Sequence, residues 1–232
     1  MQNPYEGVID ATPLPPDTRD LRRLYDIIRS RHVITILEFG VGHSTRVMAE
    51  ALQENKRDFG DKIGHLRREN PFKIFSVDSS ADFIELTRAN LKGFDVEFHH
   101  TQCRMGDFNG KICHFYDTLP NVTPDFIYLD APGQFDVTGD IAGIHTREKD
   151  RLPMAADLLR IEYFLLPRTL ILVDGRTANA RFLRDNFQRA WEYAHDVEGD
   201  VHTFELMEPP LGSYNKAQID FCLRENMKRV DW

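Results

Sequence analysis

The chain has 232 residues, of which 41% are hydrophobic and 28% are charged, and its formal net charge is −8 at pH 7. This acidic balance argues against nucleic acid as a partner, and no apolar run reaches the roughly 20 residues that a membrane span needs. Three cysteines without metal-ligand spacing, and a polar start that contains proline, indicate reduced thiols and a cytoplasmic location.

The length suits one α/β domain over residues 1–232. Residues 1–16 are rich in proline and lack periodicity, so we expect an arm that wraps the domain or meets a partner. Asp17 can cap a helix that runs to about Arg31, which completes an N-terminal segment over residues 1–32. Residues 55–71 are a charged insertion, and we expect either a solvated extension or a homo-oligomer contact or charged-substrate lip.

A buried strand and a glycine-rich turn organise the chain. Residues 33–37 are apolar and largely β-branched, which predicts a strand, and residues 46–53 predict a helix. Between them lie an acid, two glycines and two hydroxyl residues, namely Glu38, Gly40, Gly42, Ser44 and Thr45. Glycines let the backbone approach a ligand closely, and a helix start offers free N–H groups and the positive end of the dipole. In open α/β sheets, ligands bind at the edge of the sheet where the parallel strands end, which is where this turn lies.

Later segments continue the strand–helix pattern. We expect strands that end in Asp78, Asp130 and Asp174, and a polar loop over residues 133–150 after the second of them. The remaining predicted strands cover residues 96–100, 111–116, 201–207 and 218–223, and the predicted helices cover residues 81–91, 153–164 and 179–193. The last two strands predict a closing antiparallel hairpin, whereas a dinucleotide-binding sheet runs parallel throughout.

The segment Glu-x-Gly-x-Gly-x-Ser-Thr that begins at Glu38 resembles motif I of the class I S-adenosylmethionine-dependent methyltransferases. The ordered strand-end acids Asp78, Asp130 and Asp174 extend the resemblance, which is to a small-molecule O-methyltransferase-like branch. It implies an α/β three-layer sandwich of the Rossmann-like methyltransferase type, with a mostly parallel seven-stranded sheet and an antiparallel C-terminal hairpin. It also implies transfer of a methyl group from S-adenosyl-L-methionine to a small-molecule acceptor, at an oxygen.

The resemblance assigns the cofactor to the glycine turn and to the ends of the neighbouring strands. Asp78 is the main candidate, because a carboxylate can accept hydrogen bonds from both ribose hydroxyls. Asp117, before Leu119 and Pro120, is a candidate adenine contact or an exposed turn acid. The full set of predicted cofactor residues is Glu38, Gly40, Gly42, His43, Ser44, Thr45, Asp78, Ser79, Asp117 and Asp130.

Asp130 and Asp174 stand at adjacent strand ends, so they are the candidate catalytic carboxylates. Catechol O-methyltransferase and its relatives hold Mg²⁺ with such acids and an Asn, but Gly175 stands in the place of that Asn. A divalent metal such as Mg²⁺ on Asp130 and Asp174 is one alternative. In the other, Asp130 orients the acceptor or the cofactor and His145 is the catalytic base.

Arg147 and Arg176 are candidates to bind an anionic acceptor. Two other functions stay open. One is a non-catalytic protein that binds an S-adenosyl ligand, because fold does not imply activity. The other is an NAD(P)-dependent oxidoreductase, which Thr45 at the third glycine position and the terminal hairpin disfavour.

Overall fold

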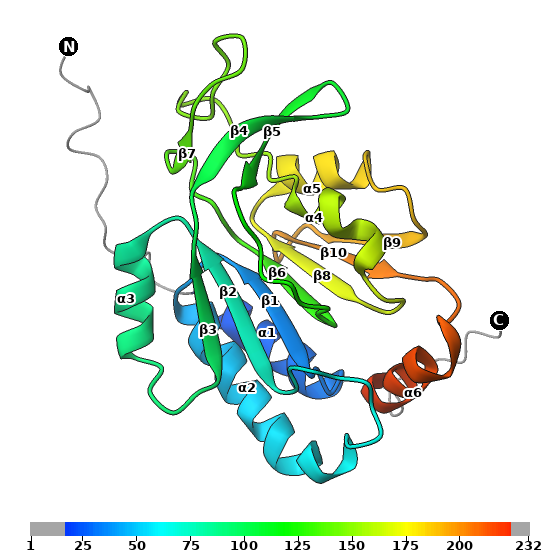
Figure 1. Cartoon of the computed structure of the whole chain (residues 1–232). Helices are drawn as coiled ribbons and strands as arrows, with labels where there is room; N and C mark the ends of the chain where they lie inside the picture. Colours follow the sequence, from blue (N-terminus) through cyan, green and yellow to red (C-terminus); the bar gives the residue numbers. More distant parts are fainter. Residues whose placement is uncertain (1–16, 224–232) are drawn as a thin grey trace.

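The computed structural model describes residues 17–223 (Figure 1). The helices are α1 (Thr18–Ser30), α2 (His43–Phe59), α3 (Ala81–Ala89), α4 (Asp157–Ile161), α5 (Thr177–Arg184) and α6 (Gly212–Leu223), with short 3-10 turns at Gly60–Lys62 and Glu162–Phe164. The strands are β1 (Thr35–Phe39), β2 (Lys73–Asp78), β3 (Val96–His100), β4 (Cys103–Phe108), β5 (Lys111–Tyr116), β6 (Phe126–Leu129), β7 (Val137–Thr138), β8 (Leu170–Asp174), β9 (Trp191–Asp196) and β10 (Val201–Leu206). Within residues 17–223, every helix is too short or too polar to cross a lipid bilayer.

Seven strands form the main sheet in the order β3-β2-β1-β6-β8-β10-β9. The pairs from β3 to β8 are parallel, and β10 pairs antiparallel with both β8 and β9. This arrangement confirms the predicted fold class, a mostly parallel sheet with an antiparallel C-terminal hairpin. The hairpin itself is β9–β10, however, and not the predicted pair of residues 201–207 and 218–223.

Two late elements differ from the prediction. The predicted helix over residues 179–193 ends at Arg184, and residues 191–196 form β9, whose side chains alternate between half-buried and exposed. The predicted strand over residues 218–223 belongs to α6, whose buried residues recur at helical spacing: Asn215, Gln218, Ile219, Cys222 and Leu223. In both segments the periodicity of burial, and not the local propensity, decides the structure.

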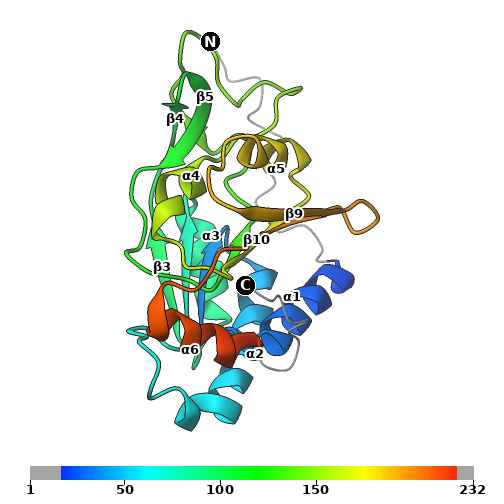
Figure 2. The same ribbon diagram turned by 90° about the vertical axis from the view of Figure 1, so that its right-hand side faces the viewer.

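Helices cover both faces of the main sheet (Figure 2). One core contains Leu24 and Ile28 of α1, buried residues of α2 and α6, and Ile36 of β1. The other contains Leu37 and Phe39 of β1 with residues of α4 and α5. Successive residues of β1 therefore enter different cores, as the alternation of side chains along a strand requires. The result is the predicted three-layer arrangement.

The connection between β3 and β6 is a β-hairpin and not a helix. Strands β4 and β5 pair antiparallel, and β7, from the loop after β6, adds a third strand in the order β5-β4-β7. The sequence predicted β5 but not β4. In Figure 1 this second sheet rises beyond the edge of the main sheet where β3 ends. It therefore stands at the carboxyl edge, beside the ends of the parallel strands.

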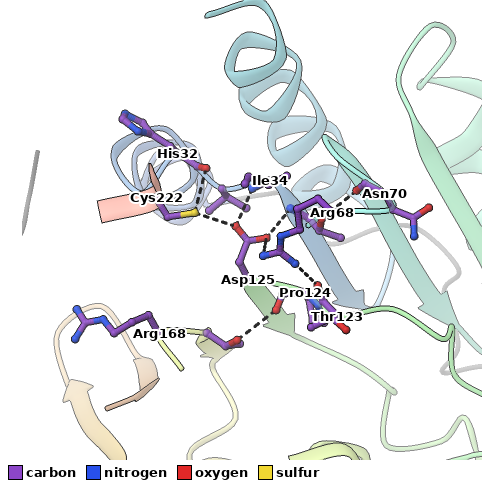
Figure 3. Close-up of polar contacts among 12 residues, drawn as sticks. His32, Ile34, Arg68, Asn70, Thr123, Pro124, Asp125, Arg168 and Cys222 are labelled. Atoms are coloured by element: carbon purple, nitrogen blue, oxygen red, sulfur yellow. Dashed lines mark hydrogen bonds and ion pairs between the residues drawn. The ribbon is translucent and has the colours of Figure 1, made fainter. Parts of the chain in front are cut away.

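Asp125 holds the strands together at their amino-terminal ends, opposite the carboxyl edge (Figure 3). Its buried carboxylate accepts hydrogen bonds from the backbone N–H groups of Ile34 and Thr35, at 2.8 and 2.6 Å. The Arg68 guanidinium lies 3.4 Å from the same carboxylate and donates to the carbonyl of Thr123 at 2.7 Å. The side chain of Arg68 is only 6% exposed, so the predicted charged insertion is anchored to the sheet through this residue.

Candidate functional site

The predicted acids meet at the carboxyl edge on one face of the main sheet. Glu38 is paired in register with Ser76 of β2 and Tyr128 of β6. Asp78 and Asp174 are the last residues of β2 and β8, and Asp130 directly follows β6. Since side chains alternate along a strand, all four acids share the face of Ile36 and the helices α1 and α2. Glu38 lies two residues deeper along the strands than the other three.

The turn after β1 requires glycine at one position and leaves open space at another. Gly40 has a φ of +98°, and a Cβ there would lie 2.9 Å from the Cβ of Ala131. Its N–H donates to the carbonyl of Val77 at 2.9 Å, which fixes the turn against β2. Gly42 has an extended φ of 165°, and a Cβ there would meet nothing within 4 Å. The backbone at Gly42, where α2 begins, is therefore open to a ligand.

Glu38 is fully buried beneath this turn, where three hydroxyl groups surround its carboxyl group. Ser44 donates at 2.8 Å, Thr45 at 2.8 and 3.0 Å to the two oxygens, and Ser76 at 2.6 Å. Burial raises the pKa of Glu38 to about 8, and the hydroxyl donors oppose this shift. Glu38, Ser44 and Thr45, predicted as cofactor residues, thus form one network that shapes the turn from below.

Asp78 connects the two turns that face each other across the ends of β1 and β2. Its Oδ2 accepts from the N–H of Val41 at 3.0 Å, and its Oδ1 accepts from the N–H of Ser80 at 2.8 Å. Burial raises the pKa of Asp78, and these backbone donors oppose the rise. The neighbouring Ser79 has a buried hydroxyl that finds no hydrogen-bond partner among residues 17–223. Each oxygen of Asp78 keeps a lone pair for a further donor.

Arg176 is the partner of Asp130. Its Nε lies 3.4 Å from Oδ1 of Asp130, and the same guanidinium donates to the carbonyls of Asp130 and Pro132, the latter at 2.9 Å. Burial raises the pKa of Asp130 to about 6, which Arg176 opposes and the charge of Asp174 reinforces. The Asp130 side chain is nevertheless 53% exposed. It is thus a reachable carboxylate at the edge of the sheet.

Asp174 accepts a hydrogen bond of 2.6 Å from the hydroxyl of Tyr128, which lies on the neighbouring strand β6. Burial raises the pKa of Asp174, the Tyr128 hydroxyl lowers it, and Asp20 of α1 raises it further. The sequence analysis missed Tyr128. The available signal was its place two residues before Asp130, on the same face of a buried strand.

The remaining predicted site residues are His43, Asp117, Arg147 and His145. His43 is exposed at the first turn of α2, and Asp117 is bound by Nε of Arg104 at 2.8 and 2.9 Å. Arg147 donates to the carbonyls of Val137 and Gly139, at 2.7 and 3.2 Å, so its guanidinium holds its own loop. His145 is half-buried, and its Nδ1 has no hydrogen-bond partner within the part of the chain described.

The loop that carries His145 and Arg147 is fixed over the edge of the sheet. Val137 of this loop pairs with Cys103 of β4, and the hydroxyl of Thr138 donates to the carbonyl of Cys103 at 3.1 Å. The negative charge of Asp136, in the same loop, contributes to the raised pKa of Asp78. The loop after β6 therefore extends toward the predicted ribose acid.

The hairpin brings a further tyrosine, Tyr116, to this region. Its ring stacks on Phe39, the last residue of β1, with 5.9 Å between the centroids. Its side chain is 1% exposed, and its hydroxyl is buried with no hydrogen-bond partner among the described residues. Burial raises its pKa well above the usual value, and the charge of Asp78 reinforces the rise. Its sequence position in an isolated strand gave no signal for this placement.

Asp130 and Asp174 do not complete a magnesium site. Mg²⁺ prefers several oxygen ligands in octahedral geometry. Here the Arg176 guanidinium already places a positive charge beside Asp130, and Gly175 contributes no side-chain donor. The residues fit an S-adenosyl ligand better, because the open backbone at Gly42 and the free lone pairs of Asp78 suit its amino acid and ribose parts.

No protein-family model and no curated protein matches the chain. A SAM complex of the O-methyltransferase TomG from Streptomyces achromogenes is 16% identical, with a TM-score of 0.45, over 84% of this chain and 82% of that chain. The SAH-bound methyltransferase PaMTH1 from Podospora anserina is 15% identical, with a TM-score of 0.49, over 84% and 80%. An RNA methyltransferase from Salinibacter ruber in complex with S-adenosyl-L-homocysteine is 15% identical, with a TM-score of 0.39, over 87% and 99%. All three TM-scores are below 0.5, and all three identities are below 25%.

Proposed function

We propose that the chain is a class I S-adenosylmethionine-dependent methyltransferase that transfers a methyl group to an oxygen of a small-molecule acceptor. The sheet topology carries this proposal. Strand β10 runs antiparallel between β8 and β9, whereas a dinucleotide-binding sheet is parallel throughout. The same observation disfavours the NAD(P)-dependent oxidoreductase.

The cofactor would bind at the start of α2. Free N–H groups at this helix start and the open backbone at Gly42 suit the carboxylate of the methionine part. The two oxygens of Asp78, already oriented by the N–H groups of Val41 and Ser80, would accept from the two ribose hydroxyls. Glu38 would act beneath the turn, by holding Ser44 and Thr45 in place.

The transfer itself asks mainly for positioning, because the sulfonium already activates the methyl group. The acceptor oxygen forms a bond to the methyl carbon, the carbon–sulfur bond breaks, and S-adenosylhomocysteine leaves with the sulfur electron pair. Asp130, with a pKa of about 6, is largely ionised at neutral pH and would take the acceptor proton or orient the hydroxyl. His145, on the loop beyond β6, is the rival base.

The acceptor would be anionic or would carry an acidic group, because Arg176 lies beside Asp130 at the end of β8. Arg147 would contribute by holding the loop through two backbone carbonyls. The acidic net charge supports a small molecule over nucleic acid as the acceptor. The three buried free cysteines, Cys103, Cys113 and Cys222, support a cytoplasmic location.

Calorimetric titration tests the proposal. We expect S-adenosylmethionine and S-adenosylhomocysteine to bind with one site per chain, with Mg²⁺ having no effect and NAD giving no heat. Absence of S-adenosyl binding would overturn the proposal. The next step is a panel of anionic hydroxyl compounds with mass detection of a one-methyl gain. Cofactor binding without any methyl product across the panel would favour the non-catalytic alternative.

A further inference from the structure

Two histidines and an aspartate come together at the end of the β9–β10 hairpin. His195 and His202 pair directly across the two strands, and Asp200 precedes β10 in the turn. Donor atoms of the three side chains all lie within 4.8 Å of one another, and within residues 17–223 no other such group of three occurs. The two imidazole rings are stacked, with 3.9 Å between their centroids and 19° between their planes.

His202 is held in a defined orientation. It is fully buried, and its Nε2 and Nδ1 lie 2.9 Å from the hydroxyls of Thr177 and Tyr193, respectively. A neutral imidazole has one N–H group and one lone pair, so one hydroxyl accepts and the other donates. A metal ion would take the place of the donating hydroxyl, and the remaining hydroxyl would then orient the ring in the manner of the outer-shell partners of metal-bound histidines.

The donor set selects the kind of ion. Two imidazole nitrogens and one carboxylate oxygen suit Zn²⁺ and its neighbours among the transition metals, whereas Mg²⁺ and Ca²⁺ prefer oxygen ligands throughout. We propose that His195, Asp200 and His202 form a binding site for a divalent transition metal ion, of which Zn²⁺ is the probe of choice. Three protein ligands leave a fourth position for water or another ligand.

The site closes by movement of its two accessible members. Bonds of about 2.0–2.2 Å place tetrahedral zinc ligands roughly 3.5 Å apart, so the group contracts by about 1 Å when the ion binds. Asp200 is exposed and His195 is partly exposed, so both side chains have room to turn toward His202. That movement also separates the two stacked rings, whose planes are inclined by 19° to each other before binding.

This site is distinct from the one proposed for methyl transfer. His202 faces α5, where Thr177 begins that helix, whereas Asp174 faces α1. The two regions meet at the end of β8: Val201 pairs with Asp174, and the N–H of Gly175 donates to the carbonyl of Asp200 at 2.9 Å. The charge of Asp200 also contributes to the raised pKa of Asp174. An ion at Asp200 therefore orders the turn that adjoins the end of β8. No step of the transfer uses the three ligands, so the inference goes beyond the proposed function.

Zinc binding to the full chain, without an added histidine tag, tests the inference. Chelator-treated protein is titrated with Zn²⁺ in competition with a chromogenic chelator, and we expect one tight site per chain. His195→Ala and Asp200→Asn are expected to weaken binding at least tenfold each, and His65→Ala, which removes an exposed histidine in another loop, to leave it unchanged.

Two further readouts separate this site from other metal sites. Co²⁺ should give visible absorption bands in the wild type that His195→Ala lacks, and a large excess of Mg²⁺ should not displace Zn²⁺. Thermal melting with and without Zn²⁺ should show stabilisation of the wild type but not of Asp200→Asn. The inference is overturned if the wild type binds no Zn²⁺, or if His195→Ala and Asp200→Asn bind it as tightly as the wild type. Neither result depends on methyltransferase activity.

Discussion

The hydroxyl of Thr45 lies 2.8 and 3.0 Å from the two carboxyl oxygens of Glu38 and also accepts the N–H of Gly42 at 3.0 Å. Thr45 stands where dinucleotide-binding proteins have a third glycine. In this chain that position must instead supply a hydroxyl, because Glu38 is buried beneath the turn and needs donors. The departure from the dinucleotide pattern and the buried acid are therefore two parts of one arrangement.

Thr45→Val tests this arrangement. Valine has nearly the same shape but removes the hydroxyl, which leaves Glu38 short of a donor and the N–H of Gly42 short of an acceptor. We expect the free energy of unfolding, measured with urea, to fall by about 1–3 kcal/mol. Thr45→Ser keeps the hydroxyl and should lose much less. Equal losses in the two variants would show that the methyl group of Thr45, and not its hydroxyl, matters.

The titration of Glu38 should make stability depend on pH. In the folded state its carboxyl group stays neutral up to a pKa of about 8, whereas in the unfolded state it ionises near 4.5. Between these values the folded state holds a proton that the unfolded state has lost. Its contribution to stability is therefore complete below about pH 4.5 and is lost as pH rises toward 8, by up to about 1.4 kcal/mol per pH unit.

Glu38→Gln removes this titration. When the pH is raised from 5.5 to 7.5, the free energy of unfolding of the wild type should therefore fall by about 2 kcal/mol more than that of the variant. Urea unfolding at the two pH values measures the difference. Glu69→Gln, at an exposed acid, is the control and should follow the wild type. A wild-type slope in Glu38→Gln would mean that Glu38 is ionised in the folded protein.

The two turn glycines should respond differently to alanine. At Gly40 a methyl group meets Ala131 at 2.9 Å and φ is +98°, so Gly40→Ala should lower the melting temperature by several degrees. At Gly42 φ is extended and the space is open, so Gly42→Ala should melt like the wild type. If the cofactor lies against this backbone, Gly42→Ala should nevertheless weaken S-adenosylmethionine binding at least tenfold in calorimetry. Unchanged affinity would place the cofactor elsewhere.

Asp78→Asn tests the ribose contact. The amide presents an N–H group to one of the two backbone donors and cannot accept from both ribose hydroxyls. We expect S-adenosylmethionine affinity to fall at least tenfold and the free energy of unfolding to fall by about 1 kcal/mol. Asp82→Asn, at an exposed acid in the first turn of α3, is the matched control. A stability loss with unchanged affinity would limit Asp78 to a structural role.

Tyr128→Phe should alter the pH dependence of turnover. The tyrosine hydroxyl lowers the pKa of Asp174, so its removal raises that pKa further. If ionised Asp174 takes part in methyl transfer, the acid limb of the kcat/KM profile moves to higher pH. Tyr25→Phe removes a similar hydrogen bond, from Tyr25 to Glu54, away from the carboxyl edge and should leave the profile unchanged. An unshifted profile in Tyr128→Phe would exclude Asp174 from the acid limb.

The parallel part of the fold was predictable because its signals are local. Each of β1, β2, β6 and β8 is a short apolar run with an acid at or beside its end. Such a run can be recognised as a buried strand from its own residues, without knowledge of distant contacts. The C-terminal third was harder. In β9 the side chains alternate between half-buried and exposed, but this strand begins only a few residues after α5 ends. In α6 the buried residues at helical spacing include the polar residues Asn215 and Gln218, which are buried by tertiary contacts.

The candidate site divides in the same way. The acids could be predicted, because each lies at or beside the end of its own strand. Tyr128 and Arg176 could not be assigned to Asp174 and Asp130, because those contacts depend on the register between β6 and β8 and on the turn into α5. The burial of Glu38 depends likewise on the hydroxyl of Ser76, 38 residues away along the chain. The roles of Gly42, Asp78, His145 and Arg147 toward a ligand stay predictions.

The pairing of β7 with β4 has a consequence for protein engineering. The loop after β6 and the hairpin after β3 share one three-stranded sheet, and Arg147 secures the loop from within. Exchanging only one of these segments with that of another enzyme would break the β4–β7 pairing and detach the loop from the edge of the main sheet. The hairpin and the loop would have to be transplanted together, as a single exchangeable cassette, to carry a new acceptor preference onto this scaffold.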